Sequence, residues 1–360
     1  MGRRITIVLG IALSALFLFL AIRGVDLHAM VRTLAKTNLW YMPPCAVLTI
    51  LALWLRSLRW RYLLHSVRPM PQSILFPATM IGFLANNVLP ARLGEIVRAH
   101  VVGRRAAISR SAALASIVVE RIFDLFTLLA LFGVVVAISK FPGGLEKVAF
   151  LVLLLGLALL ALLLVWNRYP DAVLRNITRL VPQRGKVRVA SLATGFREGL
   201  RVFDSGFHLF LVGLISIGMW VAIIFVIWLC INSLKIAVPE PQAAIVSLVA
   251  ISLVTMIPSA PGFIGTLQGA GTAALLAFGV PKEQGLAFSI VYHATQWIPI
   301  NIVGVAFLLS EGLSLGQLSQ LAGRGAESRS AGRQAEAGAP ASPAPSETST
   351  PPPSPHPRRG

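Results

Sequence analysis

Long apolar runs recur along the chain, separated by short stretches rich in arginine and lysine. Each run has about the length that a helix needs to cross a hydrocarbon core. Because unpaired backbone groups are costly in lipid, runs of this length must be helical. The pattern predicts an all-α, polytopic membrane protein. The clearest runs are Ile5–Ile22, Leu39–Leu55, Val148–Trp166, Phe207–Ile231 and Gly285–Leu309.

Basic residues mark the cytoplasmic side of a membrane protein and so constrain the topology. Residues 71–90 present a choice between a span and a re-entrant segment. If they span, two strongly basic loops, 91–110 and 167–206, lie outside; if they enter and leave on one face, both loops are cytoplasmic. The charge asymmetry favours a re-entrant segment. Its prolines, glycine and asparagines interrupt helix, which is tolerated at membrane depth only against protein or a wet cavity.

The remaining segments complete the predicted architecture. Residues 111–138 form a further span, and residues 242–279 are either two short spans or a second re-entrant hairpin. We therefore expect about six to eight spanning helices with one or two re-entrant or broken segments. The membrane domain covers residues 1–315. Residues 323–360, rich in Ala, Pro, Ser and Gly, predict a disordered cytoplasmic tail.

Composition agrees with a membrane protein. The chain is 56% hydrophobic with a formal net charge of +18, and its mean hydropathy is +0.76. We placed every basic residue except Arg121 in loops, at helix ends or in the tail, which fits topology and anionic headgroups better than nucleic acid. Cys45 and Cys230 lie in apolar runs, so no disulfide or zinc site is expected.

Three charged residues lie inside the predicted span 111–138: Glu120, Arg121 and Asp124. At about 1.5 Å per residue, Glu120 lies roughly 14 Å along the helix, near the middle of the bilayer. A charge there costs about 2.5–3.5 kcal/mol on insertion scales, so it must face protein or water. Helical spacing places the two carboxylates on one stripe, with Arg121 in reach of Asp124. The cluster is either a structural ion pair or a site for a headgroup or coupled ion.

A second polar pattern surrounds the break at the end of segment 71–90. Two amides precede a proline, and arginine, glutamate and arginine then follow at three-residue spacing. Guanidinium groups bind phosphate bidentately, and the start of a broken helix attracts anions. The alternative is a surface helix with ordinary salt bridges. The candidate residues are Asn86, Asn87, Pro90, Arg92, Gly94, Glu95 and Arg98.

A glycine-rich segment breaks the apolar stretch 242–279. Gly265 and Gly269 form a small-xxx-small pair, which is typical of close helix packing, although such breaks also form transporter binding sites. His293 in the final span is usually a structural residue, with a proton relay as the alternative. From this region we add Pro261, Gly262, Gly265, Gln268 and His293 to the candidate polar cleft.

These motifs resemble those of the lysylphosphatidylglycerol synthase transmembrane-region family of flippase-like integral membrane proteins, including its hopanoid-associated members. The family's Pro-x-Arg-x-Gly-Glu with a trailing arginine corresponds to residues 90–98, and its Glu-Arg-x-x-Asp to residues 120–124. Its Pro-Gly-Gly-x-Gly-x-x-Glu corresponds to residues 261–268, where Phe263 replaces a glycine and Gln268 replaces the glutamate. These replacements leave the family's coupling and cargo open for this chain.

The resemblance implies a lipid flippase or transporter of the bacterial inner membrane, with both termini cytoplasmic. Its cargo would be an anionic or otherwise polar-headed lipid, of phospholipid or hopanoid type. We expect no soluble synthase domain, since the predicted tail leaves no room for one, and therefore no lysyl-lipid synthesis.

We also expect no enzymatic activity, cofactor or metal, because no P-loop, Gly-x-Ser-x-Gly or His-Glu-x-x-His motif occurs. The alternatives are a non-catalytic partner of a lipid-biosynthesis enzyme and an intramembrane lipid-linked transferase. Membrane lipids are the expected partners, nucleic acid is not, and the oligomeric state stays open.

Overall fold

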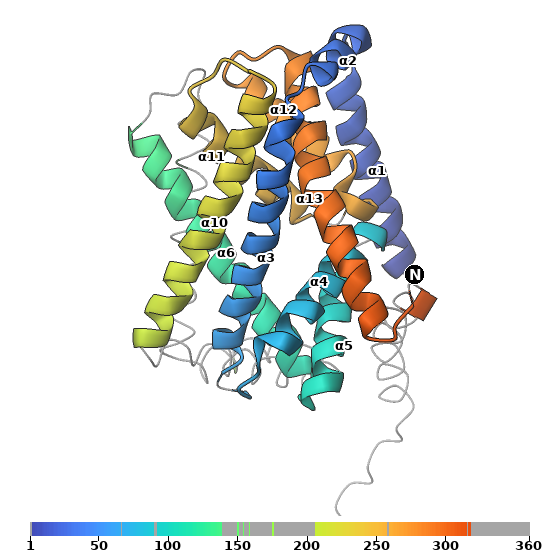
Figure 1. The fold of residues 1–360 in the computed structure, drawn as a ribbon, viewed down its shortest axis with the longest axis vertical. Coiled ribbons are helices and arrows are strands. Elements are labelled where there is room, and N and C mark those ends of the chain that lie inside the picture. The colour runs from blue at the N-terminus through green and yellow to red at the C-terminus, as the bar shows by residue number, and fades with distance from the viewer. Residues whose placement is uncertain are drawn as a thin grey trace, which may run out of the picture.

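Every regular element in the described part of the chain is a helix (Figure 1). The computed structural model describes residues 2–65, 67–89, 92–138, 206–257 and 259–314, with a few single residues at 150–175 and 316–317. The α-helices are α1 (Gly2–Ile22), α2 (Leu27–Ala35), α3 (Met42–Leu63), α4 (Gln72–Val88), α5 (Gly94–Ala106), α6 (Arg110–Ile138), α10 (Gly206–Ser233), α11 (Glu240–Thr255), α12 (Thr266–Leu276) and α13 (Lys282–Ser310). Short 3-10 helices are η1 (Leu39–Tyr41) and η3 (Pro261–Phe263).

Three helices within the described ranges are long and apolar enough to cross a membrane: Leu39–Leu63, α10 and α13. A fourth span results if Val8–Ile22 and α2, which meet at 88°, count as one. The predicted number of six to eight spans is therefore not confirmed. The predicted span 148–166, loop 167–206 and tail 323–360 lie almost entirely outside the described residues.

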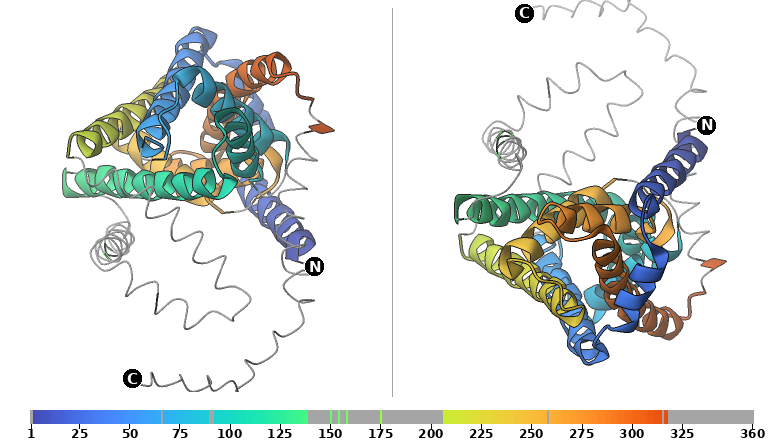
Figure 2. Two further views of the ribbon diagram at one scale, coloured as in Figure 1. Left: turned by 90° about the horizontal axis from the view of Figure 1, so that it is seen from below. Right: turned by 90° about the horizontal axis from the view of Figure 1, so that it is seen from above.

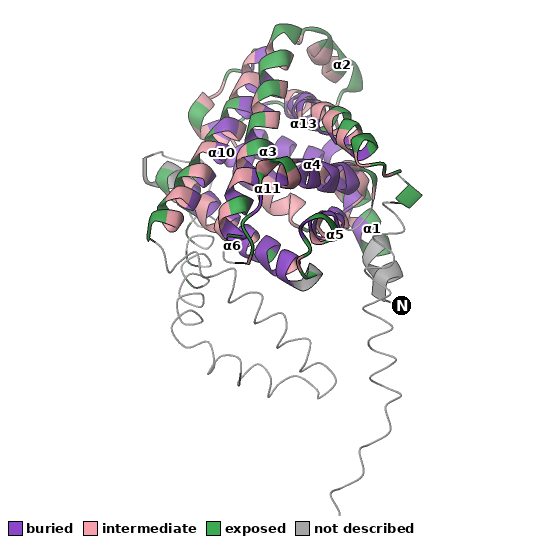
Figure 3. Ribbon diagram, turned by 60° about the horizontal axis from the view of Figure 1, so that its bottom comes forward, coloured by how far each residue is buried: buried purple, intermediate pink, exposed green. Residues whose placement is uncertain are grey.

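The helices form a bundle in which α3 packs chiefly on α10, and α13 packs on α4 and α12. In Figure 1 the pair α4–α5 occupies the lower half and α11 and α12 the upper half. Figure 2 shows α6 along one side of the bundle. Figure 3 shows that α4 is one of the most buried helices. The bundle thus brings two helix breaks, after α4 and after α11, toward its interior.

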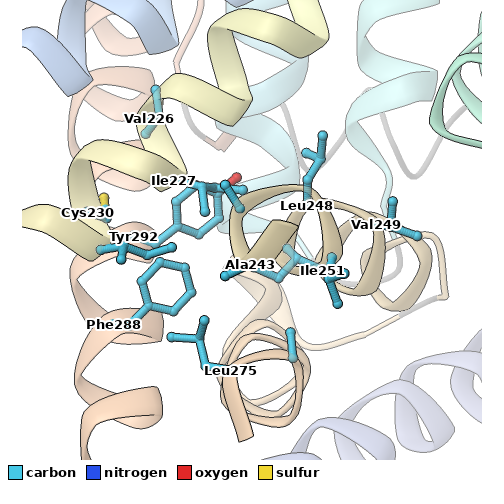
Figure 4. Close-up of a cluster of buried hydrophobic side chains, with 14 of the residues drawn as sticks. Val226, Ile227, Cys230, Ala243, Leu248, Val249, Ile251, Leu275, Phe288 and Tyr292 are labelled. Atoms are coloured by element: carbon cyan, nitrogen blue, oxygen red, sulfur yellow. The ribbon is translucent and has the colours of Figure 1, made fainter. Parts of the chain in front are cut away.

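A large apolar cluster joins the helices of the second half. Figure 4 shows side chains of α10, α11, α12 and α13 meeting there. Lipid tails are as apolar as these side chains, so close packing rather than hydrophobic burial holds such helices together. The labelled members are Val226, Ile227, Cys230, Ala243, Leu248, Val249, Ile251, Leu275, Phe288 and Tyr292.

Small residues bring the backbones into contact. A Cβ added to Gly265, whose φ is +89°, would lie 2.1 Å from the carbonyl oxygen of Ser14. A Cβ on Gly269 would lie 2.6 Å from a ring carbon of Phe17. Gly265 and Gly269 therefore let α12 pack closely on α1, which is the role that their small-xxx-small spacing is typical of.

The segment predicted to be re-entrant, residues 71–90, contains the single helix α4, which packs against α5 from the adjoining segment predicted to be a loop. A Cβ on Gly94 would lie 1.9 Å from the carbonyl oxygen of Gly82, so the two helices touch at backbone level. Asn86 Oδ1 accepts a hydrogen bond of 2.8 Å from the Gly94 N–H, which holds the turn. Pro90 lies outside the described residues. A re-entrant position of this segment in the bilayer stays a prediction.

The structure corrects the placement of three arginines. Helix α3 runs to Leu63 rather than ending at Leu55, so Arg56 and Arg59 are buried helix residues rather than loop residues. Arg98, placed in a basic loop and named as a cleft candidate by the sequence, is also a buried helix residue. The reason is the same for all three, because each guanidinium finds a carboxylate of α6 in the bundle interior.

Candidate functional site

The charged stripe of α6 faces α3. Glu120 and Asp124 are buried, and Arg56 contacts both, with Nη1 2.9 Å from Glu120 Oε1 and 2.8 Å from Asp124 Oδ2. The rings of Phe83 and Trp220 lie under the Arg56 guanidinium. One arginine therefore ties the two carboxylates together and is itself held between aromatic faces.

Two further arginines close the buried side of the cluster. Arg59 Nη2 lies 2.6 Å from Asp124 Oδ1, and its Nη1 donates to Ser216 of α10. Arg98 Nη2 lies 2.9 Å from Glu120 Oε2, an ion-pair contact without hydrogen-bond alignment. The Arg98 guanidinium also lies 3.6 Å from the ring centroid of Trp60. Helices α3, α5 and α6 are thus locked together by charge.

A second, more open layer lies on the other side of α6. Arg121 Nε is 3.2 Å from Glu95 Oε1, and its Nη1 is 3.1 Å from Asp124 Oδ2, as the helical spacing predicted for that pair. Arg92 contacts Glu95 at 3.5 Å and has a left-handed φ of 55°. The side chains of Arg92 and Arg121 are 18% and 22% exposed, so these two cations, unlike Arg59, remain accessible.

The cluster is positively charged overall. Its ion pairs join five arginines to three carboxylates, a formal surplus of two positive charges within the described ranges. Uncompensated charge in a low-dielectric interior is unfavourable. The arrangement therefore attracts an anion. The arginines are 56, 59, 92, 98 and 121, and the carboxylates are Glu95, Glu120 and Asp124.

A pocket of about 180 Å³ adjoins the open layer. The lining includes the charged residues Arg56, Arg92, Arg121 and Asp124, and most of the other lining residues are apolar or aromatic. Three of its lining residues carry side-chain donors without a protein partner: Asn87 Nδ2, Arg92 Nε and Trp220 Nε1. A mostly apolar pocket with convergent polar groups is the usual form of a ligand site. The apolar and aromatic lining includes Phe83, Leu128, Ile223, Leu248, Ile251, Phe263, Leu267, Tyr292, Trp297 and Ile300.

The second helix break forms the far edge of the pocket. The Gly265 N–H donates to Gln268 Oε1 at 2.7 Å, which turns the Gln268 amide nitrogen toward His293 Nδ1 at 2.9 Å. His293 Nδ1 therefore acts as the acceptor. Arg92 lies over the ring of Phe263 at 5.8 Å, and an added Cβ on Gly262 would lie 3.4 Å from the Asn87 carbonyl oxygen. The two breaks meet at the pocket.

The structure sorts the predicted residues into groups. Asn87, Arg92, Arg121, Asp124 and His293 line the pocket. Glu95, Arg98 and Glu120 are not part of the lining: Glu95 pairs with Arg92 and Arg121 in the open layer, and Arg98 pairs with Glu120 in the buried layer. Asn86 and Gly94 form the turn between α4 and α5. The backbone of Pro261, Gly262, Gly265 and Gln268 forms the second break.

Sequence reasoning missed Arg56, Arg59 and Trp220. A signal existed for the two arginines, because no glycine or proline interrupts residues 45–68 and the helix therefore had no reason to end at Leu55. Arg56 and Arg59, three residues apart, would then have lain on one face of a membrane helix. Trp220 is one of many apolar residues in its run, and nothing in its spacing distinguishes it.

Together, the fold and the site define a helical integral membrane protein with an arginine–carboxylate cluster beside a pocket between its helices. Ion pairs of this kind inside a membrane bundle commonly mark a path for a polar substrate. The chain belongs to the family described as the lysylphosphatidylglycerol synthase TM region, whose model matches residues 7–304. This confirms the resemblance seen in its motifs and makes the protein a member of a multi-pass membrane family.

The chain is similar to several archaeal proteins. A UPF0104 membrane protein of Methanothermobacter thermautotrophicus is 24% identical over 335 residues, covering 84% of this chain and 92% of that protein. A second UPF0104 membrane protein of the same organism is 25% identical, covering 87% of this chain and 96% of that protein. The glycosyltransferase AglD of Haloferax volcanii is 28% identical over 346 residues, or 87% of this chain. The chain spans 55% of that glycosyltransferase, about half its length.

This last relative corrects one expectation. The sequence analysis predicted no enzymatic activity because it found no familiar catalytic motif. A relative named a glycosyltransferase, matched over most of this chain, contradicts that prediction. The motif search was too narrow, since it covered only hydrolase, metalloprotease and nucleotide-loop patterns.

Proposed function

We propose that the chain binds the polar head of an anionic membrane lipid in the pocket and moves that head across the bilayer. The observation that carries the proposal is the surplus of positive charge among the residues that line a mostly apolar pocket. An anionic head neutralises the surplus, while the lipid tails stay in the hydrocarbon. A neutral or cationic head gains nothing from this surplus.

The two layers of the cluster have different roles in this proposal. Arg92 and Arg121, partly exposed at the pocket, bind the head. Arg59, Arg98 and Glu120 are buried and hold helices α3, α5 and α6 in place. In this proposal, the buried part of the cluster has the structural role, and the partly exposed part binds the headgroup.

The meeting of two helix breaks supports movement of the head. Transporter sites commonly form where discontinuous helices from the two halves of a chain meet near mid-membrane. The turn after α4 and the turn at η3 touch through Arg92 and Phe263. Both residues have positive φ, 55° and 60°, which is a strained conformation for side chains of this size. A change in either turn alters the pocket directly.

The orientation and partners follow as part of the proposal. We place the chain in the plasma membrane with its N-terminus and its basic loops on the cytoplasmic side. Membrane lipids are its ligands, and an enzyme of lipid biosynthesis supplies or removes the lipid. The orientation is tested in sealed vesicles with a single cysteine placed in the 67–71 turn. Whether a membrane-impermeant thiol reagent labels that cysteine shows on which side of the membrane the turn lies.

A second function is favoured by the relative named a glycosyltransferase. In this version, the lipid held by Arg92 and Arg121 is the carrier to or from which a sugar is transferred. The same pocket serves both functions, because a sugar carrier lipid also has an anionic head. The two differ in their product, since transport leaves the lipid unchanged and transfer alters its mass.

One experiment separates these outcomes. Purified protein is reconstituted in vesicles with fluorescently labelled phosphatidylglycerol, and the exposed label is quenched with dithionite. We expect translocation to fall at least tenfold in Arg92→Gln and to be unchanged in Arg61→Gln, a matched exposed arginine of α3. Equal rates for wild type and Arg92→Gln overturn the proposal. Mass spectrometry of the vesicle lipids, with a nucleotide sugar added, detects transfer.

A further inference from the structure

We infer that the pocket selects a lipid whose head is a phosphate monoester, with two negative charges, over a phosphodiester with one. This inference rests on the proposed function, because it specifies the chemical class of the same ligand. Two independent observations lead to it: the charge balance of the cluster and the number of donors without partners.

The charge balance requires more than one negative charge. Asp124 already contacts three arginines, Glu120 contacts three, and Glu95 contacts two. Asp124 is the one carboxylate among the described residues that line the pocket. Among the described residues that line the pocket, no further carboxylate is therefore present to neutralise the formal surplus of two positive charges. A phosphate monoester carries about −1.5 to −2 at pH 7, whereas a diester carries one negative charge.

The hydrogen-bond donors without partners also favour a phosphate monoester head. Asn87 Nδ2, Arg92 Nε and Trp220 Nε1 have no protein acceptor, and all three residues line the pocket. Unmet buried donors are unfavourable, so a ligand that offers acceptors gains from each of them. A monoester presents three terminal oxygens and a diester two. The unpartnered donors of Asn87, Arg92 and Trp220 thus number one more than the terminal oxygens of a diester.

Arg92 is the residue that interacts with the second negative charge of a phosphate monoester. Its contact with protein carboxylates is one long ion pair, 3.5 Å to Glu95, which Arg121 shares. Its backbone is held in a left-handed conformation with φ 55°. Strain of this kind persists where the surrounding structure imposes it, and it clusters at ligand sites. The cation is therefore held at the pocket without being neutralised there.

The test measures binding of three lipids to the full chain in nanodiscs of otherwise neutral lipid. The probes are phosphatidic acid as the monoester, phosphatidylglycerol as the diester and phosphatidylcholine as the zwitterion. We expect phosphatidic acid to bind at least tenfold more tightly than phosphatidylglycerol. Arg92→Gln should remove this preference, and Arg61→Gln should keep it. Trp220→Phe keeps an aromatic side chain but lacks the N–H, and should reduce phosphatidic acid binding more than phosphatidylglycerol binding.

Each outcome has a distinct meaning. Equal or tighter binding of phosphatidylglycerol overturns the monoester inference and leaves the proposed function in place. Absence of specific binding by every lipid overturns the proposed function itself. Inorganic phosphate, added as a competitor, distinguishes a lipid head from free phosphate. If it binds in the pocket as tightly as phosphatidic acid, the lipid assignment is wrong.

Discussion

Arg59 of α3 and Asp124 of α6 lie 65 positions apart in the chain, yet their Nη2 and Oδ1 atoms are 2.6 Å apart. Both side chains are almost fully buried. Asp124 lines the pocket, whereas Arg59 lies outside the pocket lining and holds Asp124 from the buried side. The pair shows that part of the charge on α6 serves helix packing. The buried ion pairs hold together the helices that position Arg92 and Arg121.

Replacing Arg59 with methionine should destabilise the protein by about 1.5–3 kcal/mol, because it removes the charge-assisted hydrogen bond to the buried Asp124 Oδ1. Thermal unfolding in detergent measures the change. Arg61→Met, at an exposed position of the same helix, should stay within about 0.5 kcal/mol of wild type. A similar effect of the two substitutions would contradict a structural role for Arg59.

Alanine at position 94 should prevent the α4–α5 hairpin from closing. Its Cβ would lie 1.9 Å from the Gly82 carbonyl oxygen and 2.5 Å from Asn86 Oδ1, so backbone must move. We expect little folded protein by size-exclusion chromatography. Gly213→Ala is the control, because nothing lies within 4 Å of its added Cβ. That substitution, inside helix α10, should be neutral or stabilise by up to about 1 kcal/mol.

Loss of the Gln268 side chain should loosen the second break. Gln268→Ala removes the acceptor of the Gly265 N–H and the donor to His293. Each polar group left unpaired in a buried site costs about 1–3 kcal/mol. The melting temperature should fall, and lipid binding should weaken with it. Gln268→Glu, which keeps an acceptor for the Gly265 N–H, should unfold closer to wild type. If alanine and glutamate behave alike, the hydrogen bond to Gly265 contributes little.

The start of α2 should depend on pH through Asp26. The backbone N–H groups of Ala29 and then His28 donate to its carboxylate, and they hold the pKa of Asp26 below its usual 3.8. A lowered pKa means that the cap stabilises the helix above about pH 4 and is lost as pH falls through the folded-state pKa.

Hydrogen exchange of the α2 amides checks this prediction. Asp26→Ala should lose protection at pH 6, and wild type should approach this variant only as the pH falls through the folded-state pKa, which lies below 3.8. Asp26→Asn also accepts these hydrogen bonds but carries no charge, so its protection should change little over the same pH range. Equal α2 protection of wild type and Asp26→Ala at pH 6 would contradict the capping role.

Much of this protein could be predicted from its sequence. Apolar run length determined that it is a helical membrane protein, because lipid allows few alternatives for the backbone. Spacing within one helix determined that Arg121 reaches Asp124, since residues three apart are neighbours on any α-helix. The motifs at residues 90–98 and 120–124 also determined the family.

Only the tertiary structure decided which helices face one another. It placed Arg56, Arg59 and Arg98 on the carboxylates of α6, and it joined the two helix breaks around one pocket. Helical periodicity shows which residues share a face, but it carries no information about the partner of that face. In lipid, that partner is set by close packing at positions such as Gly94, Gly265 and Gly269, where the backbones of distant segments touch.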